Sequence, residues 1–113
     1  MGNRARAMSE QKASASVFAA LGDETRLRLV LRLCDGGPMS ISRLTAGTKV
    51  TRQAISKHLR VMEGAGLVRS TRRGRERLWQ LERQRLADAR NYLDVISKEW
   101  DEALGRLKKF VEE

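Results

Sequence analysis

The side chains best suited to chemistry gather on one face of segment 51–63. Its apolar residues Ile55, Leu59 and Met62 fall at i, i+4 and i+7, the spacing of a buried helix face. The opposite face carries cations, an amide and a hydroxyl but no acid, on Gln53, Ser56, Lys57 and Arg60. Such groups hydrogen-bond to phosphates and to the edges of bases. The segment therefore predicts a nucleic-acid-binding helix with Thr51 as its N-cap, although a solvated basic surface helix would show the same pattern.

A basic hairpin is predicted immediately after this helix. Two short runs, 67–72 and 76–81, are rich in apolar and β-branched residues and flank a turn that contains Gly74, which is typical of a β-hairpin. Its tip carries four arginines: Arg72, Arg73, Arg75 and Arg77. A polar-faced helix followed by a basic hairpin indicates a winged helix-turn-helix, in which the helix enters the major groove and the hairpin contacts the neighbouring backbone.

These elements give a predicted contact surface for double-stranded DNA. We expect Gln53, Ser56 and Lys57 to reach base edges. We expect contacts with phosphates or the minor groove from Arg52, Arg60 and the four hairpin arginines, with Thr51 and His58 completing the surface. At His58, a packed side chain and a phosphate contact are both considered. The closest alternative function is a protein-interaction module that binds nucleic acid without sequence preference.

The distribution of charge favours DNA as the partner. The net charge is +9, and residues 49–81 alone hold 9 basic and 2 acidic residues. Residues 1–48 contribute +3 and residues 82–113 contribute −1. A basic patch this local predicts a polyanionic partner. A membrane surface is a weaker candidate, because the patch contains no amphipathic basic helix with large apolar anchors.

Other classes of function are disfavoured. The sequence shows no set of nucleophile, base and orienting residue, and no glycine-rich phosphate loop after a strand, so neither catalysis nor a cofactor is expected. Soft or borderline metals need several converging thiolates or imidazoles, and the chain has one cysteine, Cys34, and one histidine, His58. A single cysteine, no apolar run of membrane length and no visible signal peptide are consistent with the cytoplasm.

The elements that must position this surface begin with two helices. Residues 1–12 lack apolar periodicity and are interpreted as a flexible arm, followed by a helix from about Ala13 to Leu21. Asp23 is suited to cap the next helix. We predict its core face to be Leu27, Val30, Leu31 and Cys34, and expect residues 36–38 to end it.

A third, short helix completes the helix-turn-helix. Ser40 is suited to cap a helix from Ile41 to about Ala46, which a turn containing glycine joins to the polar-faced helix. The predicted fold class is mostly α with a small β-hairpin wing. One winged helix-turn-helix domain would cover residues 13–113, with its wing at about 67–81.

The last predicted helix, 85–112, carries an unbroken apolar seam. Its steps of 3 and 4 run through Leu86, Ala89, Leu93, Ile96, Trp100, Ala103, Leu107 and Phe110. A domain this small does not need so long a seam for its own core, so we predict a homodimer, with an internal core helix as the alternative. The predicted dimer interface comprises Val17, Phe18, Leu86, Leu93, Ile96, Trp100, Leu104, Leu107 and Phe110.

From about Val17 to Leu81, the chain resembles the arsenical-resistance repressor (ArsR/SmtB) family of bacterial winged-helix regulators. The resemblance rests on residues 18–28 (FAALGDETRLR), Ser56-Lys57-His58-Leu59, residues 64–68 (GAGLV) and Arg72-Arg73-Gly74-Arg75. It implies a homodimer whose first and last helices form the interface. It also implies binding to a two-fold operator and repression until an effector releases the protein.

The sequence departs from the metal-responsive members of that family. The resemblance implies a Cys-x-Cys pair at the start of the third helix, where this chain has Ser40 and Ser42. Another branch uses Asp and His ligands on the last helix, and this last helix has no histidine. The resemblance therefore points to a branch that binds no metal, with an unknown effector. Redox sensing by Cys34 is kept as an alternative, although a thiol buried among apolar groups would be inert.

Overall fold

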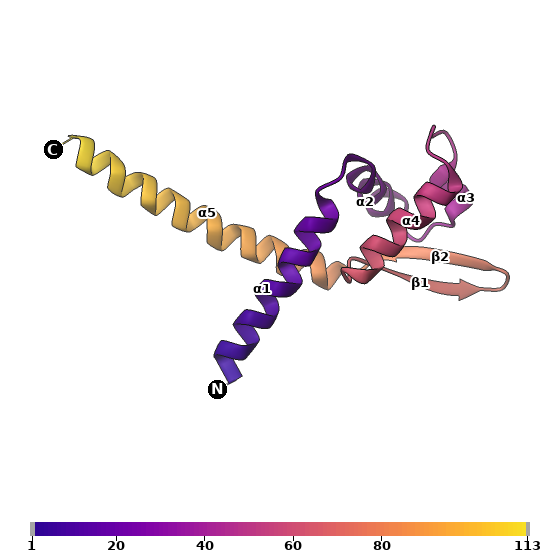
Figure 1. Cartoon of the computed structure of the whole chain (residues 1–113), viewed down its shortest axis with the longest axis horizontal. Helices are drawn as coiled ribbons and strands as arrows, with labels where there is room; N and C mark the ends of the chain where they lie inside the picture. The colour runs from indigo at the N-terminus through magenta and orange to yellow at the C-terminus, as the bar shows by residue number, and fades with distance from the viewer. Residues whose placement is uncertain (1, 113) are drawn as a thin grey trace.

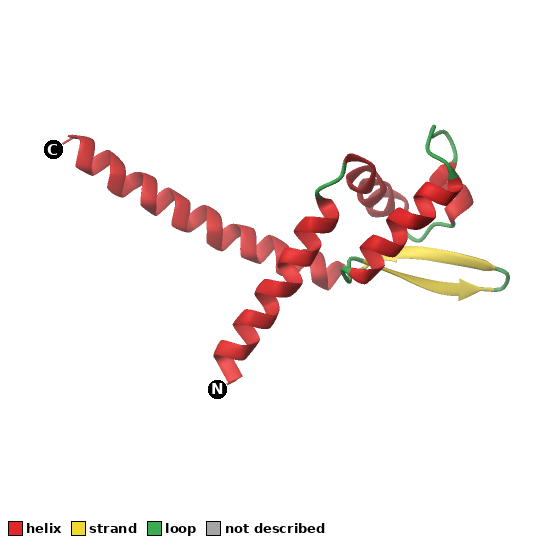
Figure 2. Cartoon of the chain, viewed as in Figure 1, coloured by secondary structure: helices red, strands yellow, loops and turns green. Residues whose placement is uncertain are grey.

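The computed structural model describes residues 2–112. Seven elements follow one another along the chain: α1 (Gly2–Leu21), α2 (Glu24–Gly36), α3 (Ile41–Thr45), α4 (Arg52–Gly64), β1 (Val68–Arg73), β2 (Glu76–Leu81) and α5 (Arg83–Glu112). Figure 1 shows an elongated molecule, with α5 extending away from the body at one end and the hairpin at the other. Figure 2 shows that helix dominates, which confirms the predicted fold class.

The first helix is longer than predicted. It begins at Gly2 rather than near Ala13, so the predicted start of this helix is wrong. Glu10, Gln11 and Lys12 are all good helix formers, and no proline interrupts them. Apolar periodicity reports a buried helix face, and its absence does not forbid a helix whose described side chains at Met8–Lys12 are exposed.

Helix α2 has the predicted ends but a different buried face. Asp23 accepts a hydrogen bond from the backbone N–H of Arg26 (3.1 Å), and Gly37, at φ 71°, ends the helix. The buried residues are Leu29, Val30 and Leu33. The predicted core face is wrong at three of its four positions, because Leu27 is 46% exposed, Leu31 is 64% exposed and Cys34 is exposed.

The cause of this error is that the inward face of α2 contains arginine. Arg26 shares a helical face with Leu29, Val30 and Leu33, and its Nε donates to the carbonyl oxygen of Ala20 (2.5 Å). Because apolar residues occur on several sides of this helix, their spacing alone does not select the face. The carbonyl oxygen of Ala20 and the Nδ1 of His58 are partners of the guanidinium, and this makes its inward position possible.

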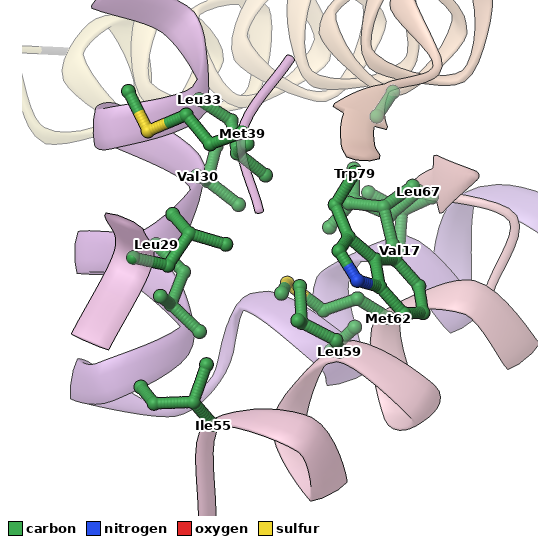
Figure 3. Close-up of a cluster of buried hydrophobic side chains, with 14 residues drawn as sticks. Val17, Leu29, Val30, Leu33, Met39, Ile55, Leu59, Met62, Leu67 and Trp79 are labelled. Atoms are coloured by element: carbon green, nitrogen blue, oxygen red, sulfur yellow. The ribbon is translucent and has the colours of Figure 1, made fainter. Parts of the chain in front are cut away.

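Helices α3 and α4 form the predicted helix-turn-helix. Ser40 caps α3 by accepting from the N–H of Arg43 (3.3 Å), and Thr51 caps α4 by accepting from the N–H of Ala54 (3.1 Å). Figure 3 shows the apolar face of α4 directed towards the side chains of α2 and of the hairpin. On that face Ile55, Leu59 and Met62 are at most 1% exposed, as predicted.

The hairpin pairs β1 and β2 in antiparallel register from Val68↔Leu81 to Arg73↔Glu76. Its two-residue turn begins at Gly74, whose φ of 66° fits the first position of a type II′ turn. The base of the hairpin is held by a bridge to the segment that precedes α3. There the N–H of Met39 donates to the carbonyl of Trp79 (2.9 Å), and the N–H of Trp79 donates back (2.8 Å).

One apolar core unites the body. It draws on α1, α2, α3, α4, the hairpin and the start of α5 (Figure 3): Val17, Ala20, Leu29, Val30, Leu33, Met39, Leu44, Ile55, Leu59, Met62, Leu67, Val68, Trp79 and Ala89. Val17 has no exposed surface, so its predicted place on the dimer interface is wrong. In the rest of α1, Phe18 is half-buried and lies 6.4 Å from Tyr92 of α5, measured between ring centroids.

Most of α5 lies outside this core. Helix α1 packs across its first part, where Leu86 is half-buried and Ala89 is buried. Beyond that crossing the helix projects from the body (Figure 1). Six large residues of its apolar surface are between 47% and 78% exposed: Leu93, Ile96, Trp100, Leu104, Leu107 and Phe110. The alternative of an internal core helix is therefore wrong for this part of α5. Among residues 2–112, no helix is long and apolar enough to cross a bilayer.

Candidate nucleic-acid interface

The outward face of α4 presents the polar groups predicted for DNA contact. Arg52, Gln53, Lys57 and Arg60 are exposed, and Ser56 is half-buried. An amide and an ammonium on one face can bond base edges, while the two guanidinium groups can reach phosphates on either side. The three buried residues on the inner face hold the helix against the core, so the outward groups project from a fixed support.

His58 differs from its neighbours on α4. Its ring is half-buried, and its Nδ1 lies 3.3 Å from Nη1 of Arg26. The same arginine donates from Nε to the carbonyl of Ala20 at the end of α1. His58 is therefore partly packed against α2, and Arg26 links α4 to α1, the helix that crosses α5.

Arg32 fixes the other helix of the motif. Its guanidinium donates to three carbonyl oxygens at the end of α3 and the turn after it, those of Arg43 (3.0 Å), Leu44 (2.8 Å) and Ala46 (3.3 Å). The last carbonyl groups of a helix lack partners within the helix, so a cation placed there satisfies both their hydrogen bonds and the negative end of the dipole. Arg32 thereby sets the turn that leads into α4.

The arrangement of the arginines on the wing favours binding of an anion. Arg72, Arg73, Arg75 and Arg77 are exposed. Arg72 and Arg77 are direct cross-strand partners, and like charges in that position repel each other. Arg77 donates to the hydroxyl of Ser70 (3.1 Å), which keeps its side chain along the hairpin. A phosphate beside this pair would relieve the repulsion.

Helix α4 and the wing tip lie at the same end of the molecule. Figure 1 shows the start of α4, beside α3, at the end from which the wing projects, and the far end of α5 at the opposite side. The molecule thus carries a basic end and, opposite it, a projecting helix with an apolar seam. The acids within segment 49–81 are Glu63 and Glu76.

The carboxyl of Asp23, at the start of α2, has a lowered pKa. The backbone N–H of Arg26 donates to Asp23 and holds the pKa of this carboxyl below its ordinary value of 3.8, with the charges of Arg26 and His58 adding to the effect. Desolvation opposes the shift without cancelling it. The ionised cap keeps the start of α2 formed, and the Arg26–His58 contact depends on that start.

Sequence reasoning missed the supporting roles of Arg26 and Arg32. Neither was included in the predicted core face of α2, because an arginine in an apolar helix is normally exposed. A signal was present in the spacing, since Arg26 and Leu33 are seven residues apart and share a face. No pattern in the sequence identifies the carbonyl oxygens that these arginines bind, because those oxygens belong to other elements.

Comparison with known proteins gives one consistent family of matches. A family model described as a helix-turn-helix domain matches residues 21–71. An HTH-type transcriptional regulator of Mycobacterium tuberculosis is 36% identical over 97 residues, which cover 86% of this chain and 87% of that protein. The transcriptional repressor SdpR of Bacillus subtilis is 31% identical over 84 residues, which cover 74% of this chain and 92% of that protein.

A solved structure agrees with these sequence matches. An ArsR-like transcriptional regulator from a Rhodococcus species superposes with a TM-score of 0.75 at 39% identity. The match covers 87% of this chain and 92% of that one. Its extent takes in the helix-turn-helix together with most of the flanking helices, which the helix-turn-helix model alone does not cover.

Proposed function

The chain belongs to the ArsR family of DNA-binding winged helix-turn-helix transcriptional regulators, and from that premise we propose that it acts as a homodimeric repressor on a two-fold operator in the cytoplasm. The proposal assigns base recognition to the outward face of α4 and backbone contacts to the wing. It assigns no catalytic activity to the chain and no metal to its regulation.

The observation that carries the proposal is the basic end of the molecule. Segment 49–81 holds nine cationic residues, and the described ones of α4 and the wing are exposed on neighbouring elements. Solubility would be served by charge spread over the surface, and it gives no reason to place Arg72 opposite Arg77. A polyanion gives such a reason, because each phosphate contact releases condensed counterions.

The dimer rests on a second observation, the exposed seam of α5. Trp100 is 65% exposed and Phe110 is 78% exposed, on a helix that continues well beyond its last contact with the body. A soluble monomer rarely leaves so continuous an apolar surface in water. A second copy packed along the same helix would cover it and would create a two-fold axis.

In such a dimer, the fold would fix the distance between the two DNA-binding units, each formed by α4 and the wing. Strand β2 ends at Leu81 and α5 begins at Arg83, with only Glu82 between them. The N–H of Glu82 donates to the carbonyl of Leu67 at the start of the hairpin (2.9 Å). The dimer helix is therefore joined to the wing without a flexible linker. Two half-sites separated by about one turn of DNA, roughly 34–36 Å, are the expected target.

A titration on two duplexes tests this proposal. An operator is first selected from a random pool with the wild-type protein, and the affinities for that operator and for a random duplex are then measured at several salt concentrations. We expect Gln53→Ala and Lys57→Ala to lose roughly 1–3 kcal/mol per contact on the operator and much less on random DNA. Arg73→Ala and Arg75→Ala should weaken both by similar factors.

The salt dependence separates the two kinds of contact. Each wing substitution removes one contact per protomer, so the slope of log affinity against log salt should flatten by about two per dimer. Lys98→Ala, on the exposed surface of α5, controls for the loss of a positive charge away from the proposed interface. Equal losses on both duplexes for the α4 variants would show that α4 is not the reader and would favour non-specific nucleic-acid binding by a protein-interaction module.

A further inference from the structure

A cavity lies where α2, the base of the wing and α5 meet. Its volume is about 630 Å³, within the usual range of about 300–1,000 Å³ for sites that hold small molecules. One wall is the end of α2 with the turn after it, from Leu33 to Pro38. The second wall is the end of β2, and the third is the first turn of α5. No part of the proposed DNA surface on α4 lines this cavity.

The lining combines an apolar floor with a polar rim. Leu33, Pro38, Leu81 and Leu86 supply the apolar surface. The charged groups at the rim are Arg69, Glu82 and Arg83. Such a mixture fits a ligand with an apolar body and one polar end, since the floor would bury the body and the rim would fix the orientation.

The charges at the rim favour an anion. Arg69 is already engaged, because its Nε lies 2.7 Å from Oε1 of Glu82, and the side-chain oxygen of Gln80 accepts from the same guanidinium when the amide is oriented towards it (2.6 Å). Within residues 2–112, Arg83 forms neither an ion pair nor a side-chain hydrogen bond, and its side chain is exposed. The cavity therefore has one uncommitted cation, which suits a single carboxylate.

A ligand in this cavity would contact segments that lead to the helix-turn-helix, to the wing and to α5. The turn at Pro38 leads to Met39, which pairs with Trp79, and then to Ser40, the cap of α3. Gln80 and Leu81 end the wing, and Arg83 begins the helix of the proposed dimer interface. A ligand in contact with all three segments would favour one angle between α5 and the DNA-binding unit formed by α4 and the wing. The spacing of the two half-sites that a dimer can contact depends on this angle.

We propose that this cavity is an effector site for a small carboxylate with an apolar body, held by Arg83 over the leucine floor. Binding itself does not depend on the proposed function. Its effect on DNA does rest on the proposed role as a dimeric repressor.

The first test uses no DNA. Binding of 1-naphthoate and octanoate to the full chain is followed by calorimetry or by ligand-observed NMR, with the uncharged 1-naphthalenemethanol as comparison. For ligands of this size we expect dissociation constants of about 0.1–1 mM. Arg83→Gln should weaken carboxylate binding about tenfold and leave the alcohol unaffected. Cys34→Phe, at an exposed position on the cavity wall, should occupy part of the cavity and weaken binding of all three probes.

Matched controls accompany both variants. Arg90→Gln makes the same charge change two turns further along α5, and Leu31→Phe places the same phenylalanine one turn earlier on the exposed side of α2. Both should bind the carboxylates as the wild type does. Absence of binding by either carboxylate, or equal binding by Arg83→Gln and the wild type, would overturn the assignment of the site.

The second test concerns regulation. A concentration of 1-naphthoate that saturates the wild type should change the operator affinity of the wild type at least threefold and that of Cys34→Phe less. Binding without any change in operator affinity would refute the effector role while leaving the ligand site in place. If the protein bound no operator at all, the proposed function would fail, and the DNA-free titration would still decide whether the cavity binds carboxylates.

Discussion

Trp100→Ala is the sharpest perturbation of the proposed dimer. Trp100 lies in the middle of the α5 seam and is 65% exposed in the protomer. Its side chain makes little contribution to the protomer's own core, so truncation should leave the free energy of unfolding of that core nearly unchanged. In a dimer the same indole would be covered by the partner helix, and its loss should weaken association.

The expected size of the effect follows from the exposed area. A free tryptophan side chain presents roughly 250 Å², so an exposure of 65% leaves about 160 Å² available for burial. At about 25 cal/mol per Å², complete coverage is worth about 4 kcal/mol per protomer. If the partner covers half of this area, the loss is about 2 kcal/mol per protomer and about 4 kcal/mol per dimer, which raises the dimer dissociation constant roughly a thousandfold.

Sedimentation equilibrium over a range of concentrations measures this constant directly. The protomer mass is 12.8 kDa, so monomer and dimer are readily separated. Lys98→Ala changes an exposed residue two positions away, off the seam, and should dimerise like the wild type. Two results would refute the reasoning: a wild-type protein that sediments as a stable monomer at micromolar concentration, or a Trp100→Ala variant whose dissociation constant equals that of the wild type.

Three further outcomes are expected. Arg32→Met keeps an unbranched side chain but loses three carbonyl contacts, so the free energy of unfolding should fall by about 1–3 kcal/mol and operator affinity should fall with it, as urea titration and binding assays would show. Because the pKa of Asp23 is lowered in the folded state, its stabilising effect is present above pH 3.8 and is lost as pH falls through the folded value. Asp23→Asn, which retains a cap, should therefore flatten the fall in urea midpoint as the pH is lowered below 3.8. Zinc, cadmium and arsenite should not alter operator binding, since residues 2–112 contain no group of three or more potential ligands, and stoichiometric uptake with release from DNA would contradict this.

The recognition helix and the wing were predictable because local rules determine them. The 3–4 spacing of Ile55, Leu59 and Met62 selects a single inward face, and the lone exposed Val61 does not form a second apolar stripe. Gly74 determines the turn in the same way, because the first position of a type II′ turn requires a positive φ. In both elements the residues that decide the structure lie within a few positions of one another.

Helix α2 was mispredicted because the deciding interactions come from elsewhere in the chain. Leucine, valine and cysteine occupy six of the eight positions from 27 to 34, so a stripe through Leu27 and Leu31 is as regular as one through Leu29 and Leu33. The inward face is the one on which Arg26 finds the carbonyl of Ala20. The same orientation leaves the thiol of Cys34 exposed, which removes the burial argument for its inertness.

The two arginines of α2 also show how the proposed reading surface depends on residues outside it. Arg32 holds the end of α3, and Arg26 joins the end of α1 to His58 on α4. Helix α1 in turn packs across α5, the helix of the proposed dimer interface. A shift of α5 would therefore reach α4 through Arg26, which lies outside both proposed surfaces, while the wing moves with α5 through Glu82. Coupling between operator binding and the α5 interface is reciprocal, so a variant that loosens Arg26 should weaken the response of operator affinity to changes at α5 more than it weakens operator binding itself.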